Sequence, residues 1–333
     1  MNQITHRWNP QRVLGVTLLL LLTGCSVSSS PTPSPTAIST SPVADPQTYN
    51  DKGLECASKG DYECALTNYQ QAILLKPDWA EPYDNRGLAY AAKGDYEHAL
   101  ADWNQAIQLQ PDFADAFLNR GLVYYNKKDY EHAITDYDQA LRLHPDDYEA
   151  MYLRGRAYSD QGKYEQAIAD FDQVIQSLPD NAYAYIARGM AYRRMGNLGR
   201  ALADNDRAVQ LKPNDPEPYY NRGNVYSDKQ DWEHAIADYD QALKIDANLV
   251  SAYVNRGIAY TNHNDLDRAL ADFNRALQLQ PDRADAYYNR GLVYTREKDN
   301  VKAVLDFQRS IELSHDPEFI KKVDEQLKSL GTP

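Results

Sequence analysis

The sequence predicts an all-α fold, an α-solenoid of eight helix–turn–helix repeats followed by a C-terminal capping helix. Three observations predict it: glycine, alanine and proline each recur every 34 residues from residue 46 onward. A period of this length is typical of stacked helix pairs. The glycines are Gly53, Gly87, Gly121, Gly155, Gly189, Gly223, Gly257 and Gly291. The alanines are Ala65, Ala99, Ala133, Ala167, Ala201, Ala235, Ala269 and Ala303, and the prolines are Pro77, Pro111, Pro145, Pro179, Pro213 and Pro281, with Ala247 once in place of proline.

An apolar run near the start, Val13–Leu22, predicts a signal peptide. Ten helical residues rise only about 15 Å, half of a hydrocarbon core, so the run is too short to span a membrane. It ends in Leu-Thr-Gly-Cys at residues 22–25, which resembles the bacterial lipobox. That resemblance implies that a signal peptide, residues 1–24, is removed and that two or three acyl chains are attached to Cys25. An ordinary secretory signal that ends in cysteine is the alternative.

Residues 25–45 are rich in serine, proline and threonine and hold too few apolar side chains to build a core. We therefore expect a disordered, extended tether between the lipid and the folded domain. The whole chain has 48 acidic against 35 basic residues, a formal net charge of −13. A surface this negative repels phosphate backbones, which argues against a nucleic-acid partner.

The repeats occupy residues 46–317 and start at residues 46, 80, 114, 148, 182, 216, 250 and 284. We number each of them 1–34. The glycine at position 8 and the alanine at position 20 are expected where the two helices of a repeat cross closest. The proline at position 32 ends the second helix, and the aspartate or asparagine at position 33 is expected to cap the next helix. These candidate caps are Asp78, Asp112, Asp146, Asp180, Asn214, Asn248 and Asp282.

This pattern resembles the tetratricopeptide repeat family across residues 46–317. The family template reads Trp-x2-Leu-Gly-x2-Tyr, then Ala-x3-Phe, then Pro. In this chain an aromatic residue stands at positions 4, 11 and 24 of every repeat, with three exceptions: Met151, Cys56 and Asn205. The resemblance implies a right-handed solenoid whose first helices line a concave groove that holds extended peptides.

The last segment, residues 316–333, is predicted to be a capping helix and tail. Phe319, Ile320, Val323 and Leu327 lie on one helical stripe, and lysines occupy the other side. In a stack of repeats such a helix covers the apolar end that no further repeat would cover.

Arginine stands at position 7 of repeats two to eight, where the family template has leucine. Position 23 is aspartate in the same seven repeats, whereas repeat one has Lys52 and Asn68. A turn centred near position 15 places positions 7 and 23 at the same height on antiparallel helices. We therefore predict bidentate ion pairs, because an unpaired buried charge costs several kcal/mol. The alternative is that these arginines are solvated and bind a ligand.

Positions 2, 5, 6, 9, 12 and 13 of each first helix face away from the second helix, and we name this surface the open face. Position 6 is asparagine in five repeats. An amide matches a peptide backbone because it offers a donor and an acceptor, and this row resembles the asparagine ladder of peptide-binding members of the family. Simple solvation of an exposed helix is the alternative. The asparagines are Asn85, Asn119, Asn221, Asn255 and Asn289.

Repeats four and five interrupt this row with Leu153 and Ala187 and bring arginines to the open face instead. In an otherwise acidic protein these arginines predict an anchor for an acidic peptide or chain terminus. A solvated charged face is the alternative. The predicted groove residues in these repeats are Arg156, Arg193 and Arg194, with Tyr152, Tyr183 and Met190.

The sequence shows no constellation for catalysis. His98, His132 and His234 occupy position 19 of separate repeats on the outer rim, so they cannot converge on one metal. No nucleophile stands beside a base at helical spacing, and no glycine-rich phosphate loop occurs. We expect a protein that is not an enzyme and that has no metal, no cofactor and no small-molecule substrate.

The two remaining cysteines, Cys56 and Cys64, occupy positions 11 and 19 of repeat one. These positions stand at the same height across the hairpin, and an exported chain lies where disulfides persist. We predict a Cys56–Cys64 disulfide, unless position 19 points away from the partner helix and holds the two Cα atoms too far apart.

Together these features predict a membrane-anchored scaffold that binds an extended peptide or a partner protein in its concave groove. We expect it in the cell envelope, lipid-anchored on the non-cytoplasmic side. Ser26, directly after the acylated cysteine, favours the outer membrane over the plasma membrane by analogy with a bacterial sorting rule. Three alternatives stay open: an assembly factor for a pilus or secretion machine, an adaptor for cell-wall enzymes, and a self-associating structural array.

Overall fold

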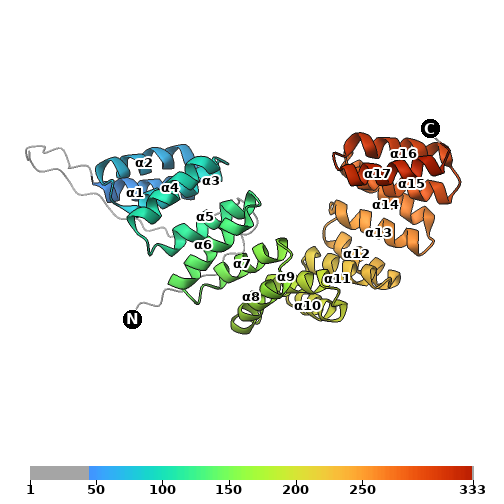
Figure 1. Ribbon diagram of the computed structural model, residues 1–333, viewed down its shortest axis with the longest axis horizontal. Helices are drawn as coiled ribbons and strands as arrows, with labels where there is room; N and C mark the ends of the chain where they lie inside the picture. Colours follow the sequence, from blue (N-terminus) through green and yellow to red (C-terminus); the bar gives the residue numbers. More distant parts are fainter. Residues whose placement is uncertain (1–44, 332–333) are drawn as a thin grey trace, which may run out of the picture. The chain divides into compact units, whose positions relative to one another are not determined.

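The computed structural model describes residues 45–331, and every regular element in that range is an α-helix (Figure 1). The seventeen helices of these residues confirm the predicted all-α solenoid. The signal peptide, Cys25 and all but the last residue of the tether lie outside the described residues. The chain divides into two compact units, one ending at Val174 and the other beginning at Ile175, and each is described by itself.

The first unit is built from pairs of helices that follow one another along the chain. Within it, α1 packs against α2, α3 against α4 and α5 against α6, and each second helix also packs against the next first helix. The last helix, α8, crosses the unit boundary. The bounds are α1 Pro46–Ser58, α2 Tyr62–Leu75, α3 Ala80–Ala92, α4 Tyr96–Leu109, α5 Ala114–Asn126, α6 Tyr130–Leu143, α7 Tyr148–Asp160 and α8 Tyr164–Ser177.

The second unit repeats this arrangement and ends in a single helix. The pairs are α9 with α10, α11 with α12, α13 with α14 and α15 with α16, and α17 packs against α16. The bounds are α9 Ala182–Arg194, α10 Leu198–Leu211, α11 Pro216–Asp228, α12 Trp232–Ile245, α13 Val250–Asn262, α14 Leu266–Leu279, α15 Ala284–Arg296, α16 Asn300–Leu313 and α17 Pro317–Ser329.

The glycine at position 8 makes room for the aromatic ring at position 24. A Cβ atom built on Gly155 would lie 2.7 Å from a ring carbon of Phe171, and one on Gly53 would lie 2.4 Å from the ring of Tyr69. The alanines at position 20 are fully buried, as their small size suggested. The aromatic ring therefore leaves no room for a side chain at position 8. In repeat five, where Asn205 replaces the ring, the backbone oxygen of Ala201 is among the nearest atoms.

The helix caps differ from the sequence prediction. The first helix of each later repeat has its N-cap at position 34 and not at position 33, because the chain makes a short turn after the second helix and helix geometry starts at position 1. Asp147, Asn181 and Asp215 cap in this way with their side chains, whereas Trp79 offers no side-chain bond. The prediction that position 33 caps the next helix was therefore wrong.

The second helices have a cap that the sequence analysis overlooked. An aspartate or asparagine at position 16 accepts a hydrogen bond from the backbone N–H three residues later, which satisfies one of the free donors at the helix start. These residues are Asp61, Asp95, Asp129, Asn197, Asp231, Asp265 and Asp299.

The turn inside each repeat uses the left-handed backbone conformation at position 15. Four repeats place glycine there, and four place a residue with a side chain: Lys128, Gln230, Asn264 and Lys298, with φ between 59° and 65°. A Cβ atom is strained in this conformation, so the non-glycine turns are less favourable than the glycine turns.

The predicted capping helix is α17, which covers the end of the second unit. Val323 is fully buried, and Phe319 and Leu327 pack with it against Tyr288 and Phe307. The lysines of α17 lie on its exposed side. The helix therefore closes the apolar core at this end.

Candidate functional site

The arginines at position 7 form the predicted ion pairs with the aspartates at position 23. In repeat two, the Nε and Nη2 atoms of Arg86 lie 2.8 and 2.6 Å from the two carboxylate oxygens of Asp102. The same bidentate geometry is found in all seven repeats that carry both residues, which confirms the prediction. The other pairs are Arg120–Asp136, Arg154–Asp170, Arg188–Asp204, Arg222–Asp238, Arg256–Asp272 and Arg290–Asp306.

The remaining guanidinium nitrogen reaches the preceding repeat, a contact that the sequence analysis missed. The Nη1 atom of Arg120 donates to Asn104 at 2.6 Å, and that of Arg222 donates to Asp206 at 2.8 Å. Both acceptors stand at position 25. The sequence does contain a pattern that indicates these acceptors, because position 25 is glutamine, asparagine or aspartate in every repeat. Arg120 and Arg222 therefore each join the two helices of their own repeat to the second helix of the previous one.

Burial controls the electrostatics of these pairs. Loss of solvent raises the pKa of the Asp136 carboxyl, and the bidentate bonds from Arg120 offset part of that rise. The hydrogen bond that Arg222 donates to the Asp238 carboxylate is the main cause that raises the pKa of Arg222. All three guanidinium nitrogens of Arg120 are engaged in bonds within the protein, which supports a structural role for the arginines of position 7.

Within each unit, the open face continues from one first helix to the next. In the first unit, Asn50 on α1 donates to Glu81 on α3 at 3.1 Å, and Asn119 on α5 donates to Asp84 on α3 at 3.0 Å. In the second unit, Asn255 on α13 donates to the Tyr220 hydroxyl on α11 at 3.1 Å. Positions 2, 5 and 6 of neighbouring repeats therefore lie against each other.

The five asparagines of position 6 already bond within the protein. Asn119 and Asn221 are buried, and the other three are partly exposed. Each side-chain amide donates to an internal acceptor: Asn85 to Asn50, Asn119 to Asp84, Asn221 to the carbonyl of Glu217, Asn255 to Tyr220 and Asn224, and Asn289 to the carbonyl of Asp285. Their contact with a peptide stays a prediction. Such a contact would have to be made by the solvent-exposed atoms of Asn85, Asn255 and Asn289.

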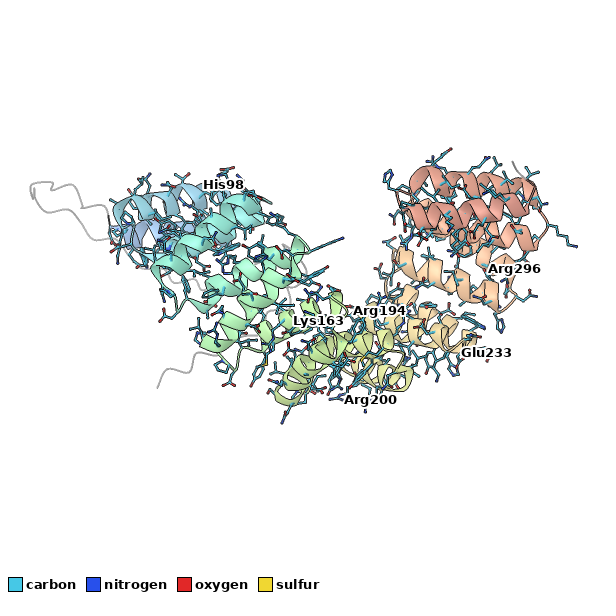
Figure 2. All side chains as sticks on the ribbon, viewed as in Figure 1. His98, Lys163, Arg194, Arg200, Glu233 and Arg296 are labelled. Atoms are coloured by element: carbon cyan, nitrogen blue, oxygen red, sulfur yellow. A yellow bond between two sulfur atoms is a disulfide. The ribbon has the colours of Figure 1, made fainter. Side chains whose placement is uncertain are left out.

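The three arginines predicted to share a patch belong to different units, Arg156 to the first and the other two to the second. The guanidinium of Arg156 lies 5.0 Å from the centre of the Tyr125 ring and donates to its hydroxyl at 3.0 Å. Arg193 forms a bidentate pair with Asp228 at 2.6 and 3.1 Å. Arg194 is exposed and makes no ion pair among residues 45–331 (Figure 2). The shared patch stays a prediction.

The other predicted groove residues in these repeats have different environments. Tyr152 is buried, and the centre of its ring lies 5.8 Å from the centre of the Phe171 ring. Tyr183 is covered by Lys212, whose amine lies 3.7 Å from the ring centre. Met190 is exposed to 44%. Of these residues, Met190 presents the largest free apolar surface.

Two aromatic side chains at position 24 reach across their repeat and hydrogen-bond to the first helix. The indole N–H of Trp103 donates to Asp84 at 2.8 Å, and the hydroxyl of Tyr239 donates to Asn224 at 2.8 Å. Position 5 or 9 of the first helix thus satisfies the polar tip of a core aromatic residue. The polar groups Asp84 and Asn224 are held in place by the core and are not mobile surface groups.

The histidines at position 19 are separate, as predicted. The Nδ1 atom of each ring lies within hydrogen-bond distance of the capping aspartate of its own helix, for example 2.7 Å between His98 and Asp95, and the carboxylate is the acceptor. His98 also stacks on Tyr90 with ring centres 5.0 Å apart. Within residues 45–331 no three histidine, cysteine or acidic side chains come together as metal ligands do.

Cys56 and Cys64 are joined by a disulfide in the structure, with their Cα atoms 5.7 Å apart. The bond takes the place of the tyrosine–histidine ring contact that joins positions 11 and 19 in repeats two, three and six. In repeat one a covalent link therefore replaces a ring contact between the two helices.

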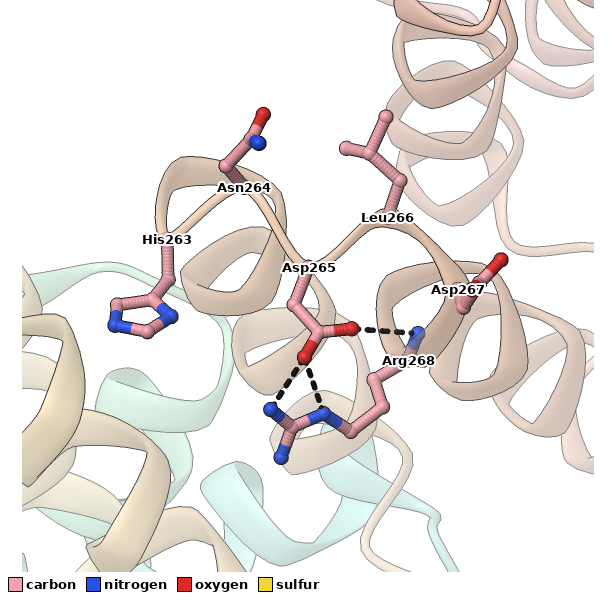
Figure 3. A pocket seen from close by; sticks show the side chains of 6 residues that line it. All are labelled: His263, Asn264, Asp265, Leu266, Asp267 and Arg268. Atoms are coloured by element: carbon pink, nitrogen blue, oxygen red, sulfur yellow. Dashed lines mark hydrogen bonds and ion pairs between the residues drawn. The ribbon is translucent and has the colours of Figure 1, made fainter.

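A shallow, open depression of about 480 Å³ lies at the turn between α13 and α14 (Figure 3). It is lined by residues 263–268 alone. Asp265 caps α14 and also pairs with the guanidinium of Arg268, whose hydrogen bond lowers the pKa of the Asp265 carboxyl. The charges of Asp265 and Arg268 therefore satisfy each other.

The length and the apolar character of the described helices show whether any of them could cross a membrane. Within residues 45–331, none of them combines the length and the apolar character that crossing a bilayer requires. The folded part of the chain that the structure describes therefore shows no membrane-spanning segment.

Family models of the tetratricopeptide repeat match the chain along most of the described residues. A model described as a TPR repeat matches residues 53–94 and 87–128. Three models described as a tetratricopeptide repeat match residues 114–147, residues 152–216, and residues 224–288 with 256–328. These descriptions name a repeat and no catalytic activity. No curated protein matches the chain.

Solved structures share the fold. A tetratricopeptide repeat protein from Parabacteroides merdae is 21% identical, with a TM-score of 0.62 over 78% of this chain and 98% of that one. Yeast Tom70 is 18% identical, with a TM-score of 0.59 over 90% and 67%. A chain of the APC/C hetero-tetramer Cut9–Hcn1 is 19% identical, with a TM-score of 0.59 over 84% of this chain and 58% of its own length. At these identities the likeness shows the fold alone.

Proposed function

The chain belongs to the tetratricopeptide repeat family, and from this premise we propose that it is a scaffold that binds a partner protein on its open face. We further propose that Cys25 carries lipid and holds the scaffold to a membrane on the non-cytoplasmic side of the cell envelope, with the outer membrane favoured. Residues 25–45 then act as the tether between the lipid and α1.

One observation carries this proposal: within each unit the open face continues from repeat to repeat and still presents large apolar side chains to solvent. Leu54 and Leu88 in the first unit are 43% and 40% exposed, and Met190 in the second is 44% exposed. Leu54 and Leu88 occupy the same position of successive first helices in one unit, and exposed apolar side chains on one surface are typical of a site that another protein covers. The hetero-tetrameric assembly named for one of the similar structures supports a role in protein association.

Anchoring is supported by the sequence of residues 13–25, an apolar run followed by a cysteine in a lipobox-like context. A lipid anchor needs no spanning helix, so it agrees with the helices of the described residues. A tether rich in proline and serine lets the scaffold stand away from the lipid surface.

Site-directed photo-crosslinking tests the binding surface. A photoreactive residue is placed at Leu88 or Met190 on the open face, and matched positions on second helices, Glu131 and Glu233, serve as controls (Figure 2 marks Glu233). We expect the same partner protein to be crosslinked from both open-face sites and from neither control. Crosslinks that arise only at Glu131 or Glu233 would show that the partner binds elsewhere.

A further inference from the structure

From the charges and exposed leucines of the first unit we infer that its open face binds a partner segment that combines basic and aliphatic side chains. This inference rests on the proposed function and names the chemistry of the partner for repeats one to three. It differs from the acidic partner that the arginines of repeats four and five predicted.

Leucines form an apolar strip along this part of the open face. Leu54, Leu88 and Leu122 stand at position 9 of α1, α3 and α5, and the first two are more than one third exposed. Ala57 and Ala91 stand beside them at position 12 and leave the leucines uncovered. Aliphatic side chains of a partner gain free energy when they cover such a strip.

Carboxylates flank the strip, and no base does. In repeats one to three the open face contains Asp51, Glu81, Asp84 and Asp115 and neither lysine nor arginine. Glu81 and Asp115 are exposed at position 2 of neighbouring helices. Asp84 is only 6% exposed, and its carboxylate accepts hydrogen bonds from Trp103 and Asn119.

The neighbouring repeat does not cancel this negative field. Arg156, the first base along the open face of the first unit, is stacked on Tyr125 and bonded to its hydroxyl. That hydroxyl in turn donates to Asp160 at 2.5 Å, which adds another carboxylate beside the arginine. Lysine and arginine side chains of a partner are therefore attracted to the strip, and an acidic segment is repelled from it.

The spacing of the strip suits an extended segment. Packed helices lie about 8–10 Å apart, and a polyproline-type chain places every third side chain on one side at intervals of about 9 Å. Aliphatic residues at every third position can thus meet successive leucines while basic residues between them reach Glu81 and Asp115.

The test uses the full chain and three labelled synthetic peptides whose binding is measured by fluorescence anisotropy. The peptides are repeats of Leu-Lys-Ser, of Leu-Glu-Ser and of Ser-Lys-Ser. We expect the first to bind about tenfold or more tightly than either of the others, because it alone satisfies both the leucines and the carboxylates. Equal binding of the Leu-Glu-Ser peptide would overturn the inferred chemistry.

Matched variants place the binding on the open face. Glu81→Gln with Asp115→Asn removes two charges from the strip, and Glu131→Gln with Glu165→Gln removes two exposed charges from position 18 of second helices in the same unit. We expect about tenfold weaker Leu-Lys-Ser binding for the first double variant and little change for the second. Leu54→Ser with Leu88→Ser should weaken binding as well, and unchanged melting curves would show that all variants fold.

Equal losses in both charge variants would show that the peptide responds to net charge alone, which overturns the inference. In that case a partner crosslinked from Leu88 and Met190 would still support the scaffold. The two proposals can therefore fail separately.

Discussion

Arg222 and Asp238 form a bidentate ion pair across the two helices of one repeat, with nitrogen–oxygen distances of 2.8 and 2.6 Å. The aspartate is 5% exposed, and the third nitrogen of the arginine reaches Asp206 in the preceding repeat. Removal of one partner leaves a buried charge, whereas replacement of both by apolar groups does not. This relationship leads to the first prediction.

Asp238→Ala should lower the free energy of unfolding by about 3 kcal/mol, because Arg222 then keeps only its bond to Asp206. The double variant Arg222→Leu with Asp238→Leu should recover most of that loss. Chemical denaturation of the single and double variants measures both values. Glu233→Ala, an exposed change on the same helix, is the control and should change stability by less than about 0.5 kcal/mol. A double variant as unstable as Asp238→Ala would exclude direct pairing as the cause.

Cys25→Ala should release the protein from membranes or block its processing, because the lipid is attached to that thiol. The measurement is fractionation of cells followed by a high-salt wash, which removes proteins held by charge alone. Ser26→Ala is the matched control and should stay with the membrane. If the Cys25 variant also stays, the lipid anchor is wrong.

Removal of the Cys56–Cys64 bond by a serine double variant should destabilise repeat one by about 2.5 kcal/mol in the chain-entropy model. Limited proteolysis and hydrogen exchange report on this repeat more directly than a global melting curve does, since repeats of a solenoid can unfold locally. Thiol labelling of the folded, unreduced protein checks the bond itself. Two freely reactive cysteines there would contradict it.

Lys128→Gly should stabilise the protein by up to about 1 kcal/mol, because Lys128 holds a left-handed backbone at which glycine has no steric cost. Gln230 and Lys298 occupy the same turn position with φ of 59° and 63° and should respond in the same way. The reverse change Gly94→Ala, at a φ of 80°, is the control and should destabilise. Thermal melts of the set measure these shifts, and a loss of stability in Lys128→Gly would contradict the strain.

Stability should fall in acid through the aspartates that cap second helices. The hydrogen bond with His132 lowers the pKa of the Asp129 carboxyl, and the bond with His234 does so for Asp231. A carboxyl whose pKa is lower in the folded state contributes stability above its unfolded pKa of about 3.9 and loses it as the pH falls through the folded value. Melting temperatures measured between about pH 5 and pH 2 should show this decline.

Asp129→Asn with Asp231→Asn keeps the caps and removes their titration, as Asn197 already does in repeat five. The decline with falling pH should be smaller in this variant than in the native chain. An unchanged pH profile would show that other carboxylates cause the acid loss.

Much of the fold was predictable because the chain repeats the same local chemistry eight times. The contact between Gly155 and Phe171 was predicted only in part. The recurring glycine predicted a tight crossing together with the alanine of position 20, and the structure places the aromatic ring of position 24 against the glycine. Which atoms fill the space beside a glycine depends on where a side chain from the second helix points, and the period alone does not contain that direction.

The candidate site was predictable only in part. Arg193 was predicted as a ligand group of the open face, and the structure pairs it with Asp228, which lies 35 residues further along. The asparagines were predicted to match a peptide backbone, and the structure bonds each of them internally, as in the contact between Asn255 and Tyr220. Both contacts join neighbouring first helices, whose relative offset is set by stacking.

By itself the sequence determined the helix pairs and the Arg–Asp partners, because positions 7 and 23 are opposite each other in any antiparallel hairpin with its turn at position 15. Lys52 and Asn68 supported this pairing, because both partners change together in the one repeat that lacks the pair. Only the tertiary structure decided which polar groups meet between repeats. Those contacts depend on the distance and offset of stacked helices, which come from the packing of whole side-chain surfaces and not from any local spacing.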